Sequence, residues 1–215
     1  MTETELIVLA VTKVGETSAV VHTLSRELGR RGFLIHVGRK TQMTLFLPLN
    51  ILEADIVENR KSQLWSLKDP VLKDALNGIR GNLHKSTISL FMSEVLYRTI
   101  RDGVNEDGLY DWAVRSILTL DAIDADFANF PIRFLLELAG ALGFSPTFDG
   151  IAPFAEKQLS QIRPFLTASF TESMLLPLSG SERNSLCESL IRYLEYHTES
   201  AIHIKSLAVL RELYQ

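Results

Sequence analysis

The most chemically suggestive part of the sequence is a basic stretch between residues 26 and 40. It holds five cationic side chains and one acidic residue, Glu27. The cations are Arg26, Arg30, Arg31, Arg39 and Lys40. Glycines flank the second and third of them and precede the last two, which predicts two short turns. Cations on neighbouring turns suit a row of phosphates, and neutralised phosphates release counterions, so the stretch predicts salt-dependent binding of nucleic acid. Surface loops also carry such residues without any ligand, and the composition leaves that alternative open.

Aromatic side chains are scarce beside these cations. Phe33 and Phe46 are the two that the surrounding stretch offers for stacking. Proteins that bind single strands stack bases on aromatic rings, in addition to neutralising phosphates. We therefore expect contacts to the phosphate backbone and no sequence-specific reading of bases.

A second group of residues combines apolar and aromatic side chains with two arginines. Its members are Leu109, Tyr110, Trp112, Arg115 and Arg133. Most of the aromatic side chains should be core. An arginine within an apolar helical pattern requires a carboxylate partner. Glu137 is an internal candidate for Arg133, and the pattern favours it; the acidic end of another protein's peptide, held in an apolar groove, is the alternative.

Catalytic and metal-binding motifs are absent from the sequence. It contains no Gly-rich phosphate loop, no His-Glu-x-x-His and no Gly-x-Ser-x-Gly. His197 and His203 lie beside glutamates, which suggests a metal site, but a solvated helix end accounts for them better. The single cysteine, Cys187, lies in an apolar helical pattern and is expected to be buried. We therefore expect no enzyme, no metal and no cofactor.

The composition is that of a water-soluble protein with a sizeable core. The chain has 215 residues, of which 46% are hydrophobic. No apolar run approaches the roughly 20 residues that span a bilayer, which excludes a membrane protein. One cysteine cannot form an internal disulfide or a cysteine-rich zinc site. The acidic N-terminus lacks the basic start of a secretory signal, so we expect a cytoplasmic protein.

The net charge of −4 hides an uneven distribution. Residues 1–80 hold 11 Lys and Arg against 9 Asp and Glu, a net charge of +2. Residues 81–215 hold 11 against 17, a net charge of −6. The negative total therefore does not argue against a nucleic-acid ligand for the first part of the chain.

The first sixty residues read as strands. Short β-rich runs separated by turn signals lie at 6–11, 18–24, 33–37, 41–47 and 51–57. Pro48 separates the last two and should lie at an edge or bend. Several short strands at this spacing predict a small antiparallel β-barrel over residues 1–75.

From about residue 70 onward the hydrophobic period becomes helical. Helices are expected over 88–100, 109–120, 130–142, 184–199 and 205–213. Ser181 is a plausible N-cap of the fourth helix. The stretch 145–180 is rich in Pro and Ser and reads as loops with short elements. The predicted fold class is α+β, with an all-helical domain over residues 76–215.

A series of short motifs runs along almost the whole chain in a characteristic order. They are Gly15-Glu16-Thr17-Ser18, Leu28-Gly29, Gly38-Arg39-Lys40, Leu47-Pro48-Leu49-Asn50-Ile51-Leu52-Glu53, Glu94, Leu109-Tyr110, Arg133-Phe134-Leu135-Leu136, Leu142-Gly143-Phe144 and Lys205-Ser206-Leu207 with Leu210. In this order and spacing the chain resembles the RecO family of bacterial recombination mediators.

The resemblance implies that residues 1–75 form an OB-fold that binds DNA and that the helical domain over residues 76–215 holds a partner-binding groove. It also implies a non-enzymatic role in recombinational repair of the RecF type, in a cytoplasmic, nucleoid-associated protein. Such proteins bind single- and double-stranded DNA and anneal complementary strands. They also bind the acidic, hydrophobic tail of the single-stranded DNA-binding protein, and with RecR they help to load RecA onto coated DNA. The alternative is a protein-interaction scaffold in DNA repair, whose barrel recruits a partner and touches DNA only weakly.

The resemblance also assigns roles to residues. The cations of the stretch 26–40 would contact phosphates. Arg133, and with it Arg115, would clamp the tail's terminal carboxylate, while Leu109, Tyr110 and Trp112 line an apolar groove. Some family members carry a four-cysteine zinc site after the Leu-Gly-Phe motif. Here Ser145-Pro146-Thr147-Phe148 follows, so no zinc is expected.

Overall fold

The computed structural model describes residues 2–39, 41–59 and 64–213, and it divides into two compact units. The first runs to Asn77 and also contains Ile100–Ile117. The second comprises Gly78–Thr99 and the chain from Leu118 onward. The expected division at residue 75 does not anticipate that Ile100–Ile117 belongs with the N-terminal part.

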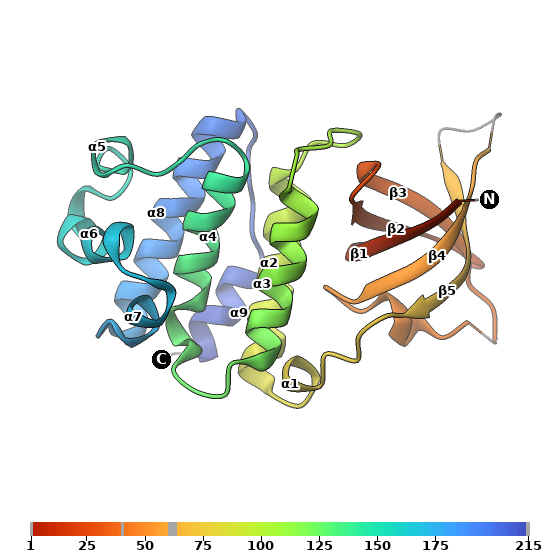
Figure 1. Ribbon diagram of the computed structural model, residues 1–215, viewed down its shortest axis with the longest axis horizontal. Coiled ribbons are helices and arrows are strands. Elements are labelled where there is room, and N and C mark those ends of the chain that lie inside the picture. Colours follow the sequence, from red (N-terminus) through yellow and green to blue (C-terminus); the bar gives the residue numbers. More distant parts are fainter. Residues whose placement is uncertain (1, 40, 60–63, 214–215) are drawn as a thin grey trace. The chain divides into compact units, whose positions relative to one another are not determined.

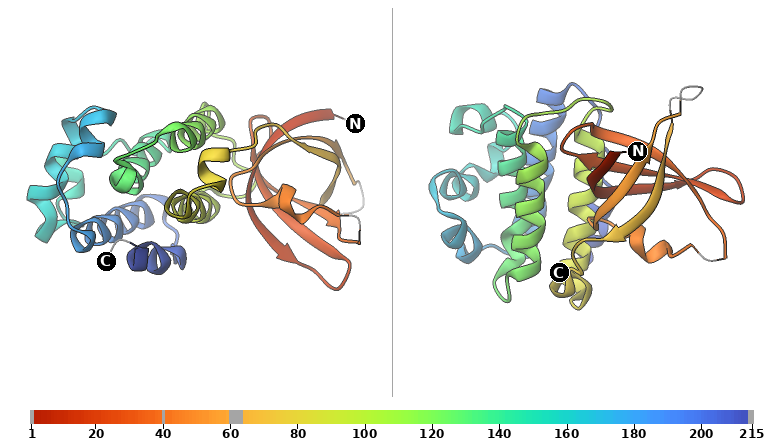
Figure 2. Two further views of the ribbon diagram at one scale, coloured as in Figure 1. Left: turned by 90° about the horizontal axis from the view of Figure 1, so that it is seen from below. Right: turned by 45° about the vertical axis from the view of Figure 1, so that its right-hand side comes forward.

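The first unit contains a closed five-stranded barrel (Figures 1 and 2). Its strands are β1 (Thr2–Lys13), β2 (Ser18–Ser25), β3 (Gly29–His36), β4 (Ile51–Val57) and β5 (Trp65–Leu72). They follow one another around the barrel in the order β1-β2-β3-β5-β4. All neighbours are antiparallel except β3 and β5, which pair in parallel. The predicted OB-like barrel and the α+β class are confirmed.

The barrel closes around alternate residues of its strands, because successive side chains of a strand point to opposite faces. The buried interior consists of Leu6, Val8, Ala19, Val21, Phe33, Ile35, Phe46, Leu52, Ala54, Ile56 and Leu67. Phe33 and Phe46 are 0% and 5% exposed. Neither aromatic ring that the sequence offers for stacking is therefore accessible to a base.

Two expectations about the strands are wrong. Residues 41–47 are not a strand but contain a 3-10 helix, η1 (Met43–Phe46). The Asn50 side-chain amide holds this turn by donating to the carbonyls of Thr44 and Leu45, both at 3.0 Å. The fifth strand is β5, which the sequence conceals because it contains Asp69 followed by Pro70, two residue types that are typical of turns. In the strand, Asp69 has a positive φ of 46°. Such residues belong to bulges and edges, where they interrupt the regular strand pattern.

The second unit is helical. Its main helices are α2 (Leu83–Thr99), α4 (Phe130–Ala141), α8 (Gly180–Thr198) and α9 (Ser206–Leu213), and α3 (Leu109–Ala122) contributes its C-terminal end. Helix α2 packs against α4, α8 and α9. Its buried face has the predicted helical spacing, with Ile88, Phe91, Met92, Val95 and Leu96 all 0% exposed. Among the described residues, no helix is long and apolar enough to cross a membrane.

Short helices occupy the stretch that reads as loops. They are α5 (Phe148–Ile151), η3 (Glu156–Gln158), α6 (Leu159–Thr167) and α7 (Phe170–Leu175), and the small α1 (Asn77–Arg80) precedes α2. Pro164 lies inside α6, and Ser169 caps α7 in a capping box with Glu172. The N-cap of α8 is Ser179 rather than Ser181, because Glu182 completes its capping box. The residues that read as helix breakers therefore begin or interrupt short helices.

Two of the short sequence motifs meet in the second unit. The carboxylate of Glu94 accepts hydrogen bonds from the backbone N–H of Lys205 at 3.1 Å and from the N–H and hydroxyl of Ser206 at 2.8 and 2.6 Å. Partial burial opposes ionisation, but these hydrogen bonds and the charge of Arg98 outweigh it and lower the pKa of Glu94. Glu94 therefore satisfies the otherwise unpaired N–H groups at the start of α9 and ties that helix to α2.

Candidate nucleic-acid interface

The basic residues of the barrel lie on and around strand β3. The turn between β2 and β3 is formed by Arg26, Glu27 and Leu28. Arg30 and Arg31 lie within β3, so the prediction that they form a turn is wrong. Successive residues of a strand point to opposite faces, which separates the two guanidinium groups.

The segment between α2 and α3, residues 100–108, is hydrogen-bonded to the β2–β3 turn and to the start of β3. The N–H of Gly103 donates to the carbonyl of Arg30, and the side chain of Asn105 donates to the carbonyl of Arg26, both at 2.8 Å. Gly29 has a φ of +61°, and a Cβ at this position would lie 2.0 Å from the carbonyl oxygen of Val104. Only glycine allows this close approach, which explains the Leu-Gly motif in this turn.

Asp102 of this segment and Asp111 in the first turn of α3 neutralise two of the arginines. Both terminal nitrogens of Arg26 contact the carboxylate of Asp111, each at 2.7 Å. Arg30, whose side chain is 17% exposed, lies 3.8 Å from the carboxylate of Asp102. Residues 1–77 hold 10 Lys and Arg against 9 Asp and Glu, and residues 100–117 hold 2 against 4, so the net charge of the first unit is −1.

Arg31 and Arg39 differ from the paired arginines. The guanidinium carbon of Arg31 lies 3.9 Å from the centre of the Trp65 ring. Arg39 is exposed in a turn that the Thr41 N–H closes by donating to the Gly38 carbonyl at 3.0 Å. Neither arginine forms an ion pair with any residue that the structure describes. Lys40 lies outside the described residues.

Four of the five residues predicted to bind a partner's tail lie in the first unit. Leu109 and Tyr110 are 1% and 3% exposed, and the Tyr110 hydroxyl donates to Glu5 Oε2 at 3.3 Å. Burial raises the pKa of Tyr110 to about 12. Trp112 is half-buried and Arg115 is exposed. Leu109 and Tyr110 therefore serve the core of this unit, and the binding of a tail peptide stays a prediction.

Arg133 belongs to the second unit and has internal partners there. Its Nε donates to Glu137 at 2.6 Å, one helical turn away. One of its terminal nitrogens donates to the carbonyls of Phe165 and Ala168, at 3.4 and 3.1 Å. Arg133 thus links α4 to the end of α6. The internal partner that the pattern favours is present.

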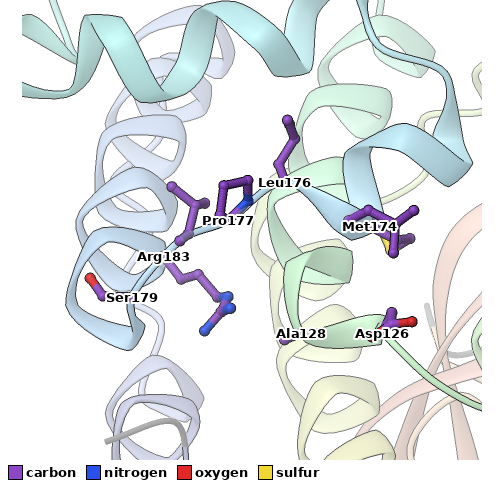
Figure 3. A pocket seen from close by; sticks show the side chains of 9 residues that line it. Asp126, Ala128, Met174, Leu176, Pro177, Ser179 and Arg183 are labelled. Carbon is purple, nitrogen blue, oxygen red and sulfur yellow. The ribbon is translucent and has the colours of Figure 1, made fainter.

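A surface pocket of about 500 Å³ lies at the start of α8 (Figure 3). It is lined by Asp126, Ala128, Met174, Leu175, Leu176, Pro177, Leu178, Ser179 and Arg183. Arg183 Nε donates to Asn129 Oδ1 at 2.8 Å, and the Asn129 amide donates to the carbonyls of Ser173 and Leu176. Sequence reasoning missed this pocket, although Ser179 and Glu182 have the spacing of a capping box directly after an apolar run.

Cys187 and His197, the side chains that the sequence offers for a nucleophile or a metal ligand, are packed inside the second unit. Cys187 is 1% exposed, as expected, and burial raises the pKa of its thiol to about 12. The ring of His197 lies between those of Phe144 and Tyr193, with centroids 5.1 and 4.3 Å away. Among residues 2–39, 41–59 and 64–213, no three His, Cys, Asp or Glu side chains are grouped so that they could hold a metal ion.

Comparisons with known proteins agree with this architecture. Residues 1–74 match the family model described as Recombination protein O N terminal, and residues 80–151 match Recombination protein O C terminal. The DNA repair protein RecO of Bacteroides fragilis is 30% identical, over 97% of this chain and 97% of its own. The proteins of the same name from Phocaeicola vulgatus and Flavobacterium psychrophilum are 27% and 26% identical over at least 97% of each chain. With both family models matched and relatives aligned over nearly their whole length, the chain belongs to the RecO family of DNA repair proteins.

Proposed function

We propose that the barrel binds single- and double-stranded DNA and that the protein acts, without catalysis, as a recombination mediator in the cytoplasm, at the nucleoid. In this role it anneals complementary strands and, with RecR, helps to load RecA onto DNA coated by the single-stranded DNA-binding protein. The observation that supports the proposal most is the state of Arg31 and Arg39. Both present a guanidinium on a five-stranded barrel without a carboxylate partner among the described residues.

The five predicted phosphate contacts are not equivalent in this proposal. Arg31 and Arg39 supply the main contacts, and Lys40 follows Arg39 directly in the sequence. Arg26 and Arg30 contribute less, because a phosphate must compete with Asp111 and Asp102 for them. Such a small set of cations supports moderate affinity that falls steeply with salt.

A salt titration of single-strand binding tests this proposal. The variant Arg39→Glu with Lys40→Glu should bind oligo-dT more weakly, and the slope of log affinity against log salt should fall by about 1.4. Lys68→Glu is the matched control, because Lys68 is an exposed cation on β5 of the same barrel. An unchanged slope for the double variant would contradict the assignment of these phosphate contacts.

A second candidate is a scaffold that touches DNA only weakly. The two ion pairs that occupy Arg26 and Arg30, and the net charge of −1 of the first unit, favour it. Under this alternative the double variant retains its interaction with RecR, and the wild-type protein shows little DNA affinity at physiological salt. Strong, salt-sensitive DNA binding by the wild-type protein would exclude it.

The tail of the single-stranded DNA-binding protein is the remaining proposed partner. Arg115 is exposed, whereas Arg133 already donates to Glu137 and to two carbonyls. Arg115→Ala and Arg133→Ala should each weaken binding of an acidic, apolar tail peptide. Thermal unfolding separates the two roles of Arg133: lower stability with intact peptide affinity would show that it acts only inside the protein.

A further inference from the structure

Strands β3 and β5 bring together an arginine and a tryptophan that the sequence keeps 34 positions apart. Phe33 and Trp65 are register partners in the parallel pairing of β3 and β5. Arg31 precedes Phe33 by two residues, so it lies on the same face of β3. The guanidinium of Arg31 lies over the indole of Trp65, with 3.9 Å between its carbon and the ring centre.

Among Phe33, Phe46 and Trp65, Trp65 is the residue that is not fully buried. Its side chain packs against the barrel core but is only half-buried, whereas Phe33 and Phe46 are 0% and 5% exposed. Leu64, directly before it, is 37% exposed. Of these three aromatic residues, Trp65 is therefore the one that a ligand can reach in part.

Within the residues that the structure describes, the guanidinium of Arg31 is positioned by its stack on Trp65. Arg26 and Arg30 are each held by an aspartate, but no ion pair joins Arg31 to any residue in the described part of the chain. A guanidinium that rests on an aromatic ring has already lost much of its rotamer freedom, and its N–H groups point outward from its edge. This arrangement prepares Arg31 for a planar or tetrahedral anion, of which phosphate is the matching group.

We propose that Arg31 and Trp65 form a nucleotide-binding subsite of the barrel. Arg31 donates to a phosphate, and the exposed part of the Trp65 indole stacks on the unpaired base next to it. The ligand is one nucleotide unit of single-stranded DNA, because stacking between neighbouring base pairs covers the faces of the bases in a duplex. Every base has a π face, so this subsite selects single strands without selecting a sequence. The inference rests on the proposed DNA-binding function and adds a base contact to it.

Fluorescence of Trp65 tests the base contact directly. The chain contains two tryptophans, so Trp112→Phe leaves Trp65 as the single reporter. The affinity of this variant for labelled oligo-dT is first measured by anisotropy. Binding of unlabelled oligo-dT should then quench and shift the emission of Trp65. An abasic oligonucleotide of the same length keeps the phosphates and should leave the emission nearly unchanged.

Substitutions in the otherwise native chain provide a second measurement. Trp65→Leu should weaken binding of oligo-dT by at least about fivefold and should weaken binding of the abasic oligonucleotide less, because Arg31 loses its stack but keeps its charge. Trp65→Phe keeps an aromatic face, so its affinity for oligo-dT should lie between that of the wild-type protein and that of Trp65→Leu. Arg31→Lys keeps the charge but loses the planar stack, so it should weaken binding of both oligonucleotides. Thermal unfolding of each variant identifies any loss that follows from a damaged barrel.

The outcomes separate this inference from the function on which it rests. If oligo-dT binds tightly but neither quenches Trp65 nor responds to Trp65→Leu, the base contact is wrong and DNA binding by the barrel stands. If the wild-type protein binds neither oligonucleotide, the proposed DNA-binding function itself fails. If dT and abasic strands respond equally to Trp65→Leu, Trp65 only positions Arg31 and the stacking contact is refuted.

Discussion

Two neighbouring regions of the barrel differ in whether their arginines form ion pairs with residues that the structure describes. At the β2–β3 turn, Arg26 and Arg30 meet Asp111 and Asp102 of the segment that precedes and begins α3. One residue further along β3, Arg31 rests on an indole, and Arg39 is exposed in the turn after this strand. Similar residue types, a few positions apart, are therefore occupied internally in one region and available in the other.

This difference shows that a local excess of positive charge does not by itself define a binding surface. The charge that matters is what remains after internal partners are counted, and those partners can come from distant parts of the chain. In this protein the segment 100–117 carries four acidic residues into the first unit. The four predictions below test whether that distinction between occupied and available charge holds.

Gly29→Ala should have the largest effect on stability, because it disrupts the close contact between the β2–β3 turn and the segment that contains Asp102 and precedes Asp111. The new Cβ would lie 2.0 Å from Val104 oxygen at a φ of +61°. We expect a loss of about 3 kcal/mol in the free energy of unfolding, measured by urea denaturation. Gly15→Ala is the control, because its φ is +77° but nothing lies within 4 Å. Backbone strain alone should cost it about 1 kcal/mol. Equal losses would show that the contact with Val104 is unimportant.

Glu94→Gln tests a charge that is fully occupied internally and should change stability rather than DNA affinity. Losing the charge-assisted bonds to Lys205 and Ser206 should cost about 1 kcal/mol, a modest value because solvent screens this half-buried group. The pKa of Glu94 is lowered below 4.5, so its stabilisation is present above that pH and is lost as the pH falls through the lowered value. Urea denaturation at neutral and acidic pH should show the two proteins converging in acid. A constant difference would refute the linkage.

Arg39→Ala and Arg26→Ala compare the two regions directly. Removing the available cation should lower single-strand affinity about fivefold and reduce the salt slope by about 0.7. Removing Arg26 should change the affinity much less, because Asp111 already holds its guanidinium. Anisotropy of labelled oligo-dT at several salt concentrations measures both. If the two variants lose the same affinity, the ion pair does not withhold Arg26 from DNA.

Asp111→Asn should have the smallest effect and the opposite sign. It releases Arg26 and removes a negative charge, so single-strand affinity should rise about twofold to threefold, while stability changes by less than about 1 kcal/mol. Asp107→Asn removes the same charge from the same exposed segment and is the control. A gain of equal size in both variants would indicate a general effect of net charge rather than the release of Arg26.

Much of the fold could be predicted from hydrophobic period alone. Four of the five strands lie where β-rich runs between turn signals indicate, and helices α2, α3, α4, α8 and α9 lie where period 3.6 indicates. Strand β5 was not predicted, because Asp69 and Pro70 are typical of a loop. Residues 41–47 were wrongly predicted as a strand, because side-chain hydrogen bonds from Asn50 hold them in η1. A local pattern cannot report a bond that forms only after the chain has turned back on itself.

The candidate site was predictable in its residue types but not in its geometry. The cations between residues 26 and 40 stand out in the sequence, and so does the scarcity of aromatics nearby. Trp65 was not anticipated, because it reaches Arg31 only through the parallel pairing of β3 with β5. The Gly29 motif was visible, but its reason is the carbonyl of Val104 on a separate segment.

The sequence by itself determined the barrel followed by helices, the absence of a cysteine-based zinc site and the presence of a basic stretch, because these depend on composition and local period. Tertiary structure alone decided which cations are available. Arg26 and Asp111 are separated by 85 residues yet form a bidentate pair. Coulomb and stacking interactions act over a few ångströms in space, whatever the separation along the chain, so only the folded chain sets the charge that a DNA strand meets.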